Sequence, residues 1–517
     1  MPPFVGHKRH WGLQIGRKLA LFLPPALQFY PKKAYIYGMK RAILSLVALL
    51  GIVVSFMTYR TQTYLSTQPL GIAPIAPIAI PDSAIARLSA AIQVRSISYD
   101  DKPSDSTALY ALQQLLAQHF PLCHRHMKRE NVAQYSLLYQ WQGKQADLLP
   151  IMFIGHLDVV PATDTAAWQM PPFSGAVKDG ILWGRGALDD KLSVWGALEA
   201  AEMLLQQGFQ PQQSIYFGFG HDEEIGGSGA QAIAALLQQR GIKLGFLLDE
   251  GMVITQGIAP SLSRPLASIG LAEKGYLSVQ LTATSIGGHS SMPTPQTAVG
   301  SICQAVAALE ANPMPQTLTP LTRQMFAAIG PETELPLRAV FANQWLLEPL
   351  ILRALAQGNA TNATTRTTTA PTMLQGSPKE NVLANEAKAV INFRILPGET
   401  MDDVLNHIRQ TIHNDSIKIT PLAGGNNPGK VADTQSPYYQ NLVKTAKEIF
   451  PDAVIAPGLV IATTDARHYE GVTDNAFRFL PIQLNQADLS SIHGNNERIA
   501  IDNYKNLIRF YHRLMGL

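Results

Sequence analysis

Residues 151–158 read IMFIGHLD, a short apolar run that ends in a histidine and an aspartate. The length and composition of this run are those of a buried strand. Two later stretches repeat the pattern, because residues 215–224 read IYFGFGHDEE and residues 245–250 read GFLLDE. Apolar residues at roughly helical spacing over residues 192–205 lie between the first two strands. This alternation predicts an α/β fold with a mainly parallel sheet flanked by helices.

Polar side chains follow each of these three strands. Sites in open α/β sheets form beyond the carboxyl ends of the strands, so we expect these side chains to meet at one edge. An acidic pair at a helix entrance, GRGALDDK over residues 184–191, and a late histidine join the set. Paired metal ions in hydrolases need such carboxylates and imidazoles, with one more carboxylate free to move protons. The candidates are His156, Asp189, Glu223, Glu224, Asp249 and His493.

Each fragment has an ordinary structural explanation when it is taken alone. A His-x-Asp sequence after a strand, such as His156 with Asp158, is more often a structural pair than a ligand site. Adjacent acids such as Glu223 and Glu224 usually lie on solvated loops. The presence of all the fragments at strand ends in one chain favours a metal site.

The segment 273–425 has a different pattern. Its strands and helices predict a small α+β, ferredoxin-like domain inserted into the first domain. The predicted strands are residues 276–283 and 387–394, and the predicted helices are residues 297–310 and 401–412. The first domain would then consist of residues 82–272 and 426–517, and it would close with an amphipathic helix from Asp502.

The N-terminal region carries a membrane signal. Residues 42–59 are uncharged and mostly apolar, close to the lower length limit for a helix that crosses a bilayer. The first 60 residues contain nine Lys or Arg and no acidic residue, and eight of the nine precede the apolar run. The positive-inside rule therefore puts a basic head, residues 1–41, in the cytoplasm and the catalytic domain in the periplasm, in a lumen or outside the cell. A cleaved signal peptide is the alternative to this anchor. The Pro-rich part of residues 60–81 predicts an extended stalk.

Composition excludes other classes of protein. The chain has 517 residues, of which 46% are hydrophobic and 15% charged, so it is a folded protein and not a disordered one. After residue 60 there are 32 Lys and Arg against 38 Asp and Glu. This mildly acidic body argues against nucleic acid as a partner. Cys123 and Cys303 receive no role, because their spacing does not define a pair.

Four blocks make the chain recognisable. They are HLDVVP at residues 156–161, GRGALD at 184–189, DEEIGG at 222–227 and DEG at 249–251. Together they resemble the signature blocks of the di-zinc aminoacylase and carboxypeptidase family. Three further motifs resemble those of the branch that contains yeast carboxypeptidase S and the mammalian N-fatty-acyl-amino-acid synthase/hydrolase. They are GHDEE at 220–224, RTTTA at 366–370 and IHGNNE at 492–497. The resemblance implies a zinc-peptidase-like fold in which the inserted domain is a lid.

The resemblance also implies two zinc ions in each subunit. One ion would be held by His156 and Asp249, and the other by Glu224 and His493. Asp189 would be shared by both ions. Family members differ in which acid of the DEG block they use, so Glu250 is the alternative to Asp249.

Asp158 and Glu223 are the catalytic residues that the resemblance implies. Asp158 can accept the free N–H of His156 and fix its tautomer. Glu223 is next to the ligand Glu224 without being a ligand, so it can take a proton from water and deliver it to the leaving amine. The implied reaction is hydrolysis of a peptide or N-acyl amide bond next to a free carboxylate, without a covalent intermediate.

Residues of the inserted domain are candidates for substrate binding. His289 resembles a histidine that reaches the active site of a neighbouring subunit and stabilises the oxyanion, which implies a homodimer through the lid domain. Asn381 and Arg394 match family positions that bind the carbonyl and the carboxylate of the substrate. Arg467 is a further candidate. The ordinary alternative for a strand arginine such as Arg394 is a surface position.

Other classes of function fit the sequence less well. A catalytically silent binding module with the same fold is the main alternative, and the unliganded Glu223 argues against it. A serine hydrolase is excluded, since GGHSSM at residues 287–292 lacks the Gly-x-Ser-x-Gly elbow. The glycines between residues 218 and 229 do not form a dinucleotide fingerprint.

Overall fold

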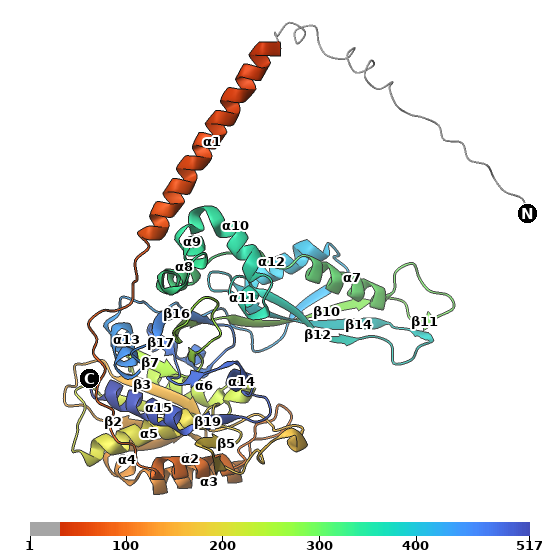
Figure 1. The fold of residues 1–517 in the computed structure, drawn as a ribbon. Helices are drawn as coiled ribbons and strands as arrows, with labels where there is room; N and C mark the ends of the chain where they lie inside the picture. The colour runs from red at the N-terminus through yellow and green to blue at the C-terminus, as the bar shows by residue number, and fades with distance from the viewer. Residues whose placement is uncertain (1–31) are drawn as a thin grey trace, which may run out of the picture. The chain divides into compact units, whose positions relative to one another are not determined.

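The computed structural model describes residues 32–517, with side chains from Tyr37 onward. The chain divides between Thr63 and Tyr64 into two compact units. In the first unit the described residues form one helix, α1 (Lys32–Gln62) (Figure 1). From Tyr37 to Gln62 this helix is long and apolar enough, by length and composition, to cross a membrane.

The predicted anchor, residues 42–59, lies inside this apolar part of α1. Residues 1–31 of the predicted basic head lie outside the described residues.

A mixed sheet forms the centre of the second unit. Among the described residues it has ten strands in the order β1-β2-β6-β3-β7-β17-β9-β8-β18, with β16 paired to β9. The strands are β1 (Lys128–Val132), β2 (Ser136–Trp141), β3 (Ile151–His156), β6 (Ile215–Gly220), β7 (Phe246–Asp249), β8 (Ile254–Thr255), β9 (Leu266–Glu273), β16 (Val454–Val460), β17 (Ala476–Arg478) and β18 (Gln483–Leu484). The central ladder β6-β3-β7-β17 is parallel. The three strands predicted to begin at residues 151, 215 and 245 are therefore confirmed, and they correspond to β3, β6 and β7 in the centre of the sheet.

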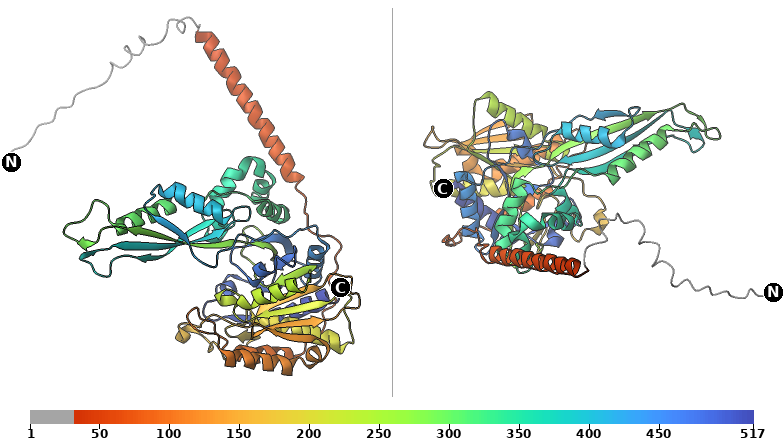
Figure 2. Two further views of the ribbon diagram at one scale, coloured as in Figure 1. Left: turned by 180° about the vertical axis from the view of Figure 1, so that it is seen from behind. Right: turned by 90° about the horizontal axis from the view of Figure 1, so that it is seen from above.

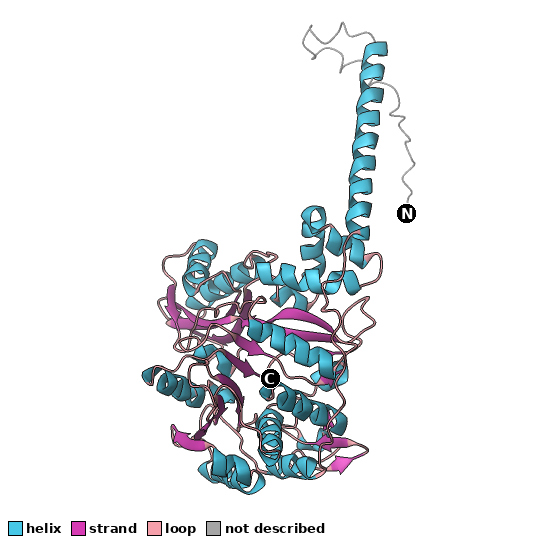
Figure 3. Ribbon diagram, turned by 90° about the vertical axis from the view of Figure 1, so that its left-hand side faces the viewer, coloured by secondary structure: helices cyan, strands magenta, loops and turns pink. Residues whose placement is uncertain are grey.

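Helices cover both faces of this sheet (Figure 3). Ile151 and Phe153 of β3 belong to a hydrophobic core with one group of helices, whereas Met152 and Ile154 pack in a second core on the other face. The first face carries α2 (Ser83–Gln93), α3 (Ser106–His119), α4 (Pro121–His126), α5 (Lys191–Gln206), α13 (Pro437–Ile449) and α15 (Ile501–Met515), and the second face carries α6 (Ser228–Gln239). A strand with apolar side chains in both directions needs cover on both sides, which explains this layering.

A second, antiparallel sheet has its own hydrophobic core. Its order is β12 (Thr368–Gln375), β14 (Glu386–Ile395), β10 (Gly275–Thr284) and β15 (Lys418–Pro421). Helices α7 (Ala298–Ala311) and α12 (Met401–Ile412) pack on it. The strands and helices predicted for this segment are confirmed, while its function as a lid stays a prediction.

Four helices between α7 and β12 had no sequence-based prediction. They are α8 (Pro320–Ile329), α9 (Leu337–Ala342), α10 (Gln344–Leu355) and α11 (Asn359–Ala363). The first three enclose a small core of Leu318, Phe326, Phe341 and Ile351, and Tyr64 packs against this core. We call α8, α9 and α10 the three-helix cluster.

The first three residues of the predicted stalk, 60–62, belong to α1, and the part from Tyr64 onward is bound to the second unit. Residues 64–81 contain neither helix nor strand. The backbone N–H of Ile75 donates to the carbonyl of Glu448 at 3.2 Å, and Arg509 Nε donates to the carbonyl of Ile78 at 3.0 Å. Since an extended segment leaves its backbone groups unpaired, the folded unit supplies these partners and holds the segment along its surface.

Candidate metal centre

The polar residues expected at one edge of the sheet do meet there. β3 lies between β6 and β7, and all three strands run parallel. His156 is the last residue of β3, and Glu223 and Glu224 begin a short turn, η3 (Glu223–Ile225), just after β6. Glu250 follows the end of β7. The topology of the sheet therefore assembles side chains that are far apart in the sequence.

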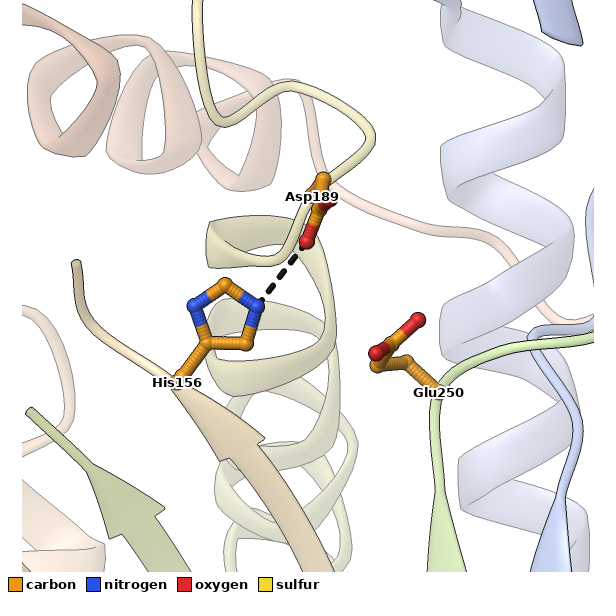
Figure 4. Close-up of side chains that lie close together, drawn as sticks. All are labelled: His156, Asp189 and Glu250. Carbon is orange, nitrogen blue, oxygen red and sulfur yellow. Dashed lines mark hydrogen bonds and ion pairs between the residues drawn. The ribbon is translucent and has the colours of Figure 1, made fainter. Parts of the chain in front are cut away.

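Asp189 lies between two histidines. Its Oδ1 is 2.9 Å from Nε2 of His156, and its Oδ2 is 2.9 Å from Nε2 of His493. Nε2 of His493 is also 3.2 Å from Oε2 of Glu224. Two groups of potential ligand atoms result, and in each group the atoms lie within 4.8 Å of one another. The groups are His156, Asp189 and Glu250 (Figure 4), and Asp189, Glu224 and His493.

Glu250, not Asp249, lies in the first of these groups. Oδ1 of Asp249 accepts the N–H of Glu250 at 2.9 Å, and its Oδ2 accepts the N–H of Ala466 at 2.8 Å. Successive side chains at a strand end point to opposite sides, so only one acid of the pair can face Asp189. The geometry thus differs from the sequence-based preference for Asp249 and favours the alternative, Glu250.

This donor set fits divalent cations. Imidazole nitrogens and carboxylate oxygens are the ligands that zinc takes in hydrolases. Oε1 of Glu224 is buried and has no hydrogen-bond partner among the described residues. Burial raises the pKa of both Glu224 and Glu250, and the carboxylate of Asp189 raises it further. Cations bound between these groups would satisfy the orphaned oxygen and offset the repulsion among the carboxylates.

Asp158 makes several hydrogen bonds within the site. Its backbone carbonyl is 3.0 Å and its Oδ1 is 3.3 Å from Nδ1 of His156. Its carboxylate also accepts the N–H groups of Glu223 and Glu224 at 3.1 and 3.2 Å, and the hydroxyl of Ser98 at 2.7 Å. Asp158 therefore contacts the histidine through its backbone carbonyl and its carboxylate, and the carboxylate also holds the backbone of the two glutamates.

Glu223 lies beside the cluster and belongs to neither ligand group. Burial raises the pKa of its carboxyl to about 8, and the carboxylates of Asp189 and Glu224 contribute to this shift. A carboxyl group with such a pKa can exist in both protonation states near neutral pH.

Glu497 is a structural residue that sequence reasoning missed. Its Oε1 accepts the N–H groups of Gly186, Leu188 and Asp189 at 3.0, 2.7 and 3.2 Å. Its Oε2 pairs with the buried guanidinium of Arg185. An acid four residues after His493 is an ordinary sequence feature, and only its full burial distinguishes it.

A small sheet supports the same junction. β19 (Arg498–Ala500) follows the turn of His493 and pairs with β5 (Ile181–Trp183), which leads into the turn of Asp189. β4 (Val177–Lys178) is its third strand. This pairing and Glu497 together bring the C-terminal histidine to the aspartate.

A cavity of about 890 Å³ opens next to the cluster. Glu223 and His493 line one part of it, and Tyr276, Arg394 and Arg467 line another. The guanidinium of Arg394 lies 4.9 Å from the centre of the Tyr276 ring. Burial lowers the pKa of Arg394, and the positive charge of Arg467 nearby contributes. Two arginines that face one cavity are suited to bind an anion.

His289 and Asn381 lie elsewhere. His289 is in a two-residue strand, β11 (Gly288–His289), which pairs with β13 (Val382–Leu383) at the end of the antiparallel sheet that is far from the main sheet (Figure 2). The N–H of Ser290 donates to the carbonyl of Asn381 at 3.2 Å, so the two candidates are neighbours. Neither residue lines the cavity beside the metal cluster.

The α/β fold and the clustered carboxylates and histidines define a metal-dependent hydrolase. Residues 152–516 match the model of peptidase family M20/M25/M40. The chain belongs to this family.

Curated relatives cover most of the chain. It is 42% identical over 435 residues to "Probable carboxypeptidase S-like 2" of Dictyostelium discoideum, which covers 83% of this chain and 84% of that protein. It is 40% identical over 430 residues to the "N-fatty-acyl-amino acid synthase/hydrolase PM20D1" of Mus musculus, which covers 82% of this chain and 85% of that protein.

Solved structures share the fold. The M20 family metallo-carboxypeptidase Sso-CP2 from Sulfolobus solfataricus superposes with a TM-score of 0.64 at 17% identity, over 84% of this chain and 99% of that one. Human carnosine dipeptidase 1 gives a TM-score of 0.57 at 17% identity, over 84% of this chain and 95% of that one.

Proposed function

We propose that this chain is a membrane-anchored hydrolase that uses two zinc ions to cleave a peptide or N-acyl amide bond next to a free carboxylate. The observation that carries the proposal is the position of Asp189, whose two oxygens face two separate groups of ligand atoms. His156 and Glu250 would hold one ion and Glu224 and His493 the other, with Asp189 shared. Two such ions, when bound, polarise a carbonyl group and lower the pKa of a water molecule.

Glu223 moves the proton in this reaction. It accepts a proton from the attacking water and donates it to the nitrogen of the leaving amine. The carboxylate of Asp158 accepts hydrogen bonds from the backbone N–H groups of Glu223 and Glu224, and these bonds hold Glu223 beside the cluster. The position of Asp158 supports its role in orienting His156 for the metal.

Arg394 and Arg467 would bind the carboxylate of the substrate. Replacing Arg394 by Ala should raise KM and lower kcat/KM by about 10- to 100-fold, because a hydrogen bond to a charged group contributes about 1.5 to 3 kcal/mol. The loss should be seen with an N-acyl amino acid and be absent with its carboxamide. Arg409→Ala, at an exposed arginine of α12, is the matched control. An equal loss for both substrates would contradict the assignment.

His289 and Asn381 are proposed to act on a second subunit. Their distance from the cavity of their own chain fits residues that complete the site of a partner in a homodimer. His289 would then stabilise the oxyanion, and Asn381 would bind the carbonyl of the substrate.

The substrate class follows from the relatives and the anchor. The names of the two curated relatives point to carboxypeptidase and N-fatty-acyl amino acid chemistry. A hydrolase with α1 in the membrane, its N-terminus in the cytoplasm and its catalytic unit on the other side would act on peptides or N-acyl amino acids there. Tethering at the bilayer favours lipid-derived amides.

The function can be tested with metal and substrate together. A chelator should abolish hydrolysis of N-oleoyl-Phe, and added zinc should restore it, with about two metal ions per chain at full activity. Gly-Leu tested in parallel separates the two substrate classes. Activity on the dipeptide alone would reject N-fatty-acyl amino acids as the substrates. Activity that survives complete metal removal would reject the proposed metal-dependent hydrolysis.

A further inference from the structure

Thr464 lies at the start of the turn that carries Arg467. It directly precedes η5 (Asp465–Tyr469), and Arg467 and His468 of this turn line the cavity beside the metal cluster. The backbone N–H of Arg467 donates to the carbonyl of Thr464 at 3.3 Å. The position of Thr464 therefore determines where the backbone of Arg467 lies.

A buried carboxylate holds Thr464 from the main sheet. Glu273 is the last residue of β9, and it is 1% exposed. Its Oε2 accepts both the backbone N–H and the hydroxyl of Thr464, each at 2.9 Å. A threonine at the start of a helical turn often accepts an N–H of that turn, but the side chain of Thr464 makes no such bond with the described residues. Its hydroxyl binds the sheet instead.

The side chain of Arg467 is held at its other end. Its Nη2 donates to the carbonyl of Gly226 at 3.0 Å, and its Nε donates to Nε2 of His468 at 3.3 Å. Burial lowers the pKa of His468 to about 4, and the positive charge of Arg467 contributes, so the ring is neutral and can accept this bond. Gly226 directly follows η3, the turn of Glu223 and Glu224. The guanidinium is therefore fixed beside the metal centre.

The ion pair of Glu273 is a poor source of stability. Nε of Arg478 lies 3.4 Å from Oε2 of Glu273, and both side chains are buried. Among the described residues, Oε1 of Glu273 and Nε of Arg478 have no hydrogen-bond partner. A buried ion pair that leaves polar atoms unsatisfied regains little of the free energy lost on desolvation. The two bonds to Thr464 are the specific feature that this carboxylate provides.

We propose that Glu273 and Thr464 are positioning residues, which hold Arg467 where it binds the carboxylate of the substrate. Neither residue is among those that line the cavity, so they act through Arg467 and not on the substrate itself. The main sheet would thus set one of the two arginines, whereas Arg394 belongs to β14 of the antiparallel sheet. The inference rests on the proposed function, because it requires a substrate with a free carboxylate.

A comparison of two substrates tests this role in the full chain. We define the carboxylate preference as kcat/KM for N-oleoyl-Phe divided by kcat/KM for its carboxamide, or the same ratio for Gly-Leu where only the dipeptide is cleaved. Thr464→Val keeps the shape but loses the hydroxyl, and it should lower this preference by about 3- to 10-fold, because a displaced arginine loses part of a charged hydrogen bond. Thr464→Ser keeps the hydroxyl and should retain the preference.

Thr333→Val is the matched control. Thr333 is buried between α8 and α9 of the three-helix cluster, and its hydroxyl donates to the carbonyl of Gly330 at 2.7 Å. This variant loses a comparable bond outside the cavity, so its Tm should fall while its carboxylate preference stays unchanged. Thr464→Val combined with Arg467→Ala should show the same preference as Arg467→Ala alone, because the threonine acts only through this arginine.

Glu273→Gln is the second positioning variant. It should lower the carboxylate preference in the same direction as Thr464→Val, since an amide oxygen is a weaker acceptor than a carboxylate. The change also leaves Arg478 without its buried counter-charge, so the threonine variants decide the question where Glu273→Gln does not fold.

The outcomes separate this inference from the proposed function. A Thr464→Val variant with an unchanged preference, in a protein whose preference falls in Arg467→Ala, overturns the positioning role and leaves the proposed function intact. A loss of equal size with and without Arg467 also overturns the inference, because the threonine then acts by another route. Unmodified protein that cleaves the acid and the carboxamide equally, or cleaves neither, contradicts the proposed function, and the inference is rejected with it.

Discussion

Replacing Glu223 by Gln should lower kcat by about 10²- to 10⁴-fold, the range that a positioned acid or base contributes. Glutamine has nearly the same shape but cannot take a proton from water. Because Glu223 belongs to neither ligand group, the metal content of the variant should match that of the unmodified protein. Steady-state kinetics on a purified sample, with metal analysis of the same sample, would measure both quantities.

Glu224→Gln is the matched control for this experiment. The neighbouring residue has a buried oxygen without a partner and an oxygen 3.2 Å from His493, so its loss should lower metal content as well as rate. A Glu223→Gln variant with full metal and a kcat within about tenfold of the unmodified protein would show that another group moves the proton.

Replacing Glu250 by Gln should remove about one of the two metal ions and nearly all activity. Its carboxylate lies within 4.8 Å of the ligand atoms of His156 and Asp189. Asp249→Asn is the matched variant at the adjacent acid. It should keep both ions, because the oxygens of Asp249 already accept two backbone N–H groups.

Metal analysis after dialysis against a weak chelator would measure the difference, with Tm as the check on folding. Asp249→Asn costs up to one backbone hydrogen bond, so we expect a lower Tm by the equivalent of about 1 kcal/mol. The reverse result, with metal lost from Asp249→Asn and retained in Glu250→Gln, would restore the ligand that the sequence favoured.

Much of the fold could be predicted because its strands are strongly patterned. The runs at 151–155 and 215–219 are continuous and apolar, which reflects burial on both faces of the sheet. The helices α8 to α10 could not be predicted from a family pattern or from one periodicity. Proline at position 349 lies inside α10, and the exposed leucines blur its polar side.

The site could be predicted to the level of segments and not to the level of single atoms. The ends of parallel neighbours such as β3 and β6 must lie together, so His156 and Glu224 were foreseeable as a cluster. The choice between Asp249 and Glu250 depends on where β7 ends and which way each side chain leaves it. Glu497 depends on a contact across 312 residues with Arg185, and no local pattern encodes it.

The hydrogen bonds of Glu497 also determine when, during synthesis of the chain, the site can form. Asp189 leaves the ribosome long before His493 and Glu497, which lie more than 300 residues later in the sequence. Until then the backbone N–H groups of Gly186 and Leu188 lack their acceptor, and the aspartate has only its first histidine. A growing chain would therefore remain inert toward the amides around it until His493 and Glu497 have been synthesised and have folded onto the segment of Asp189.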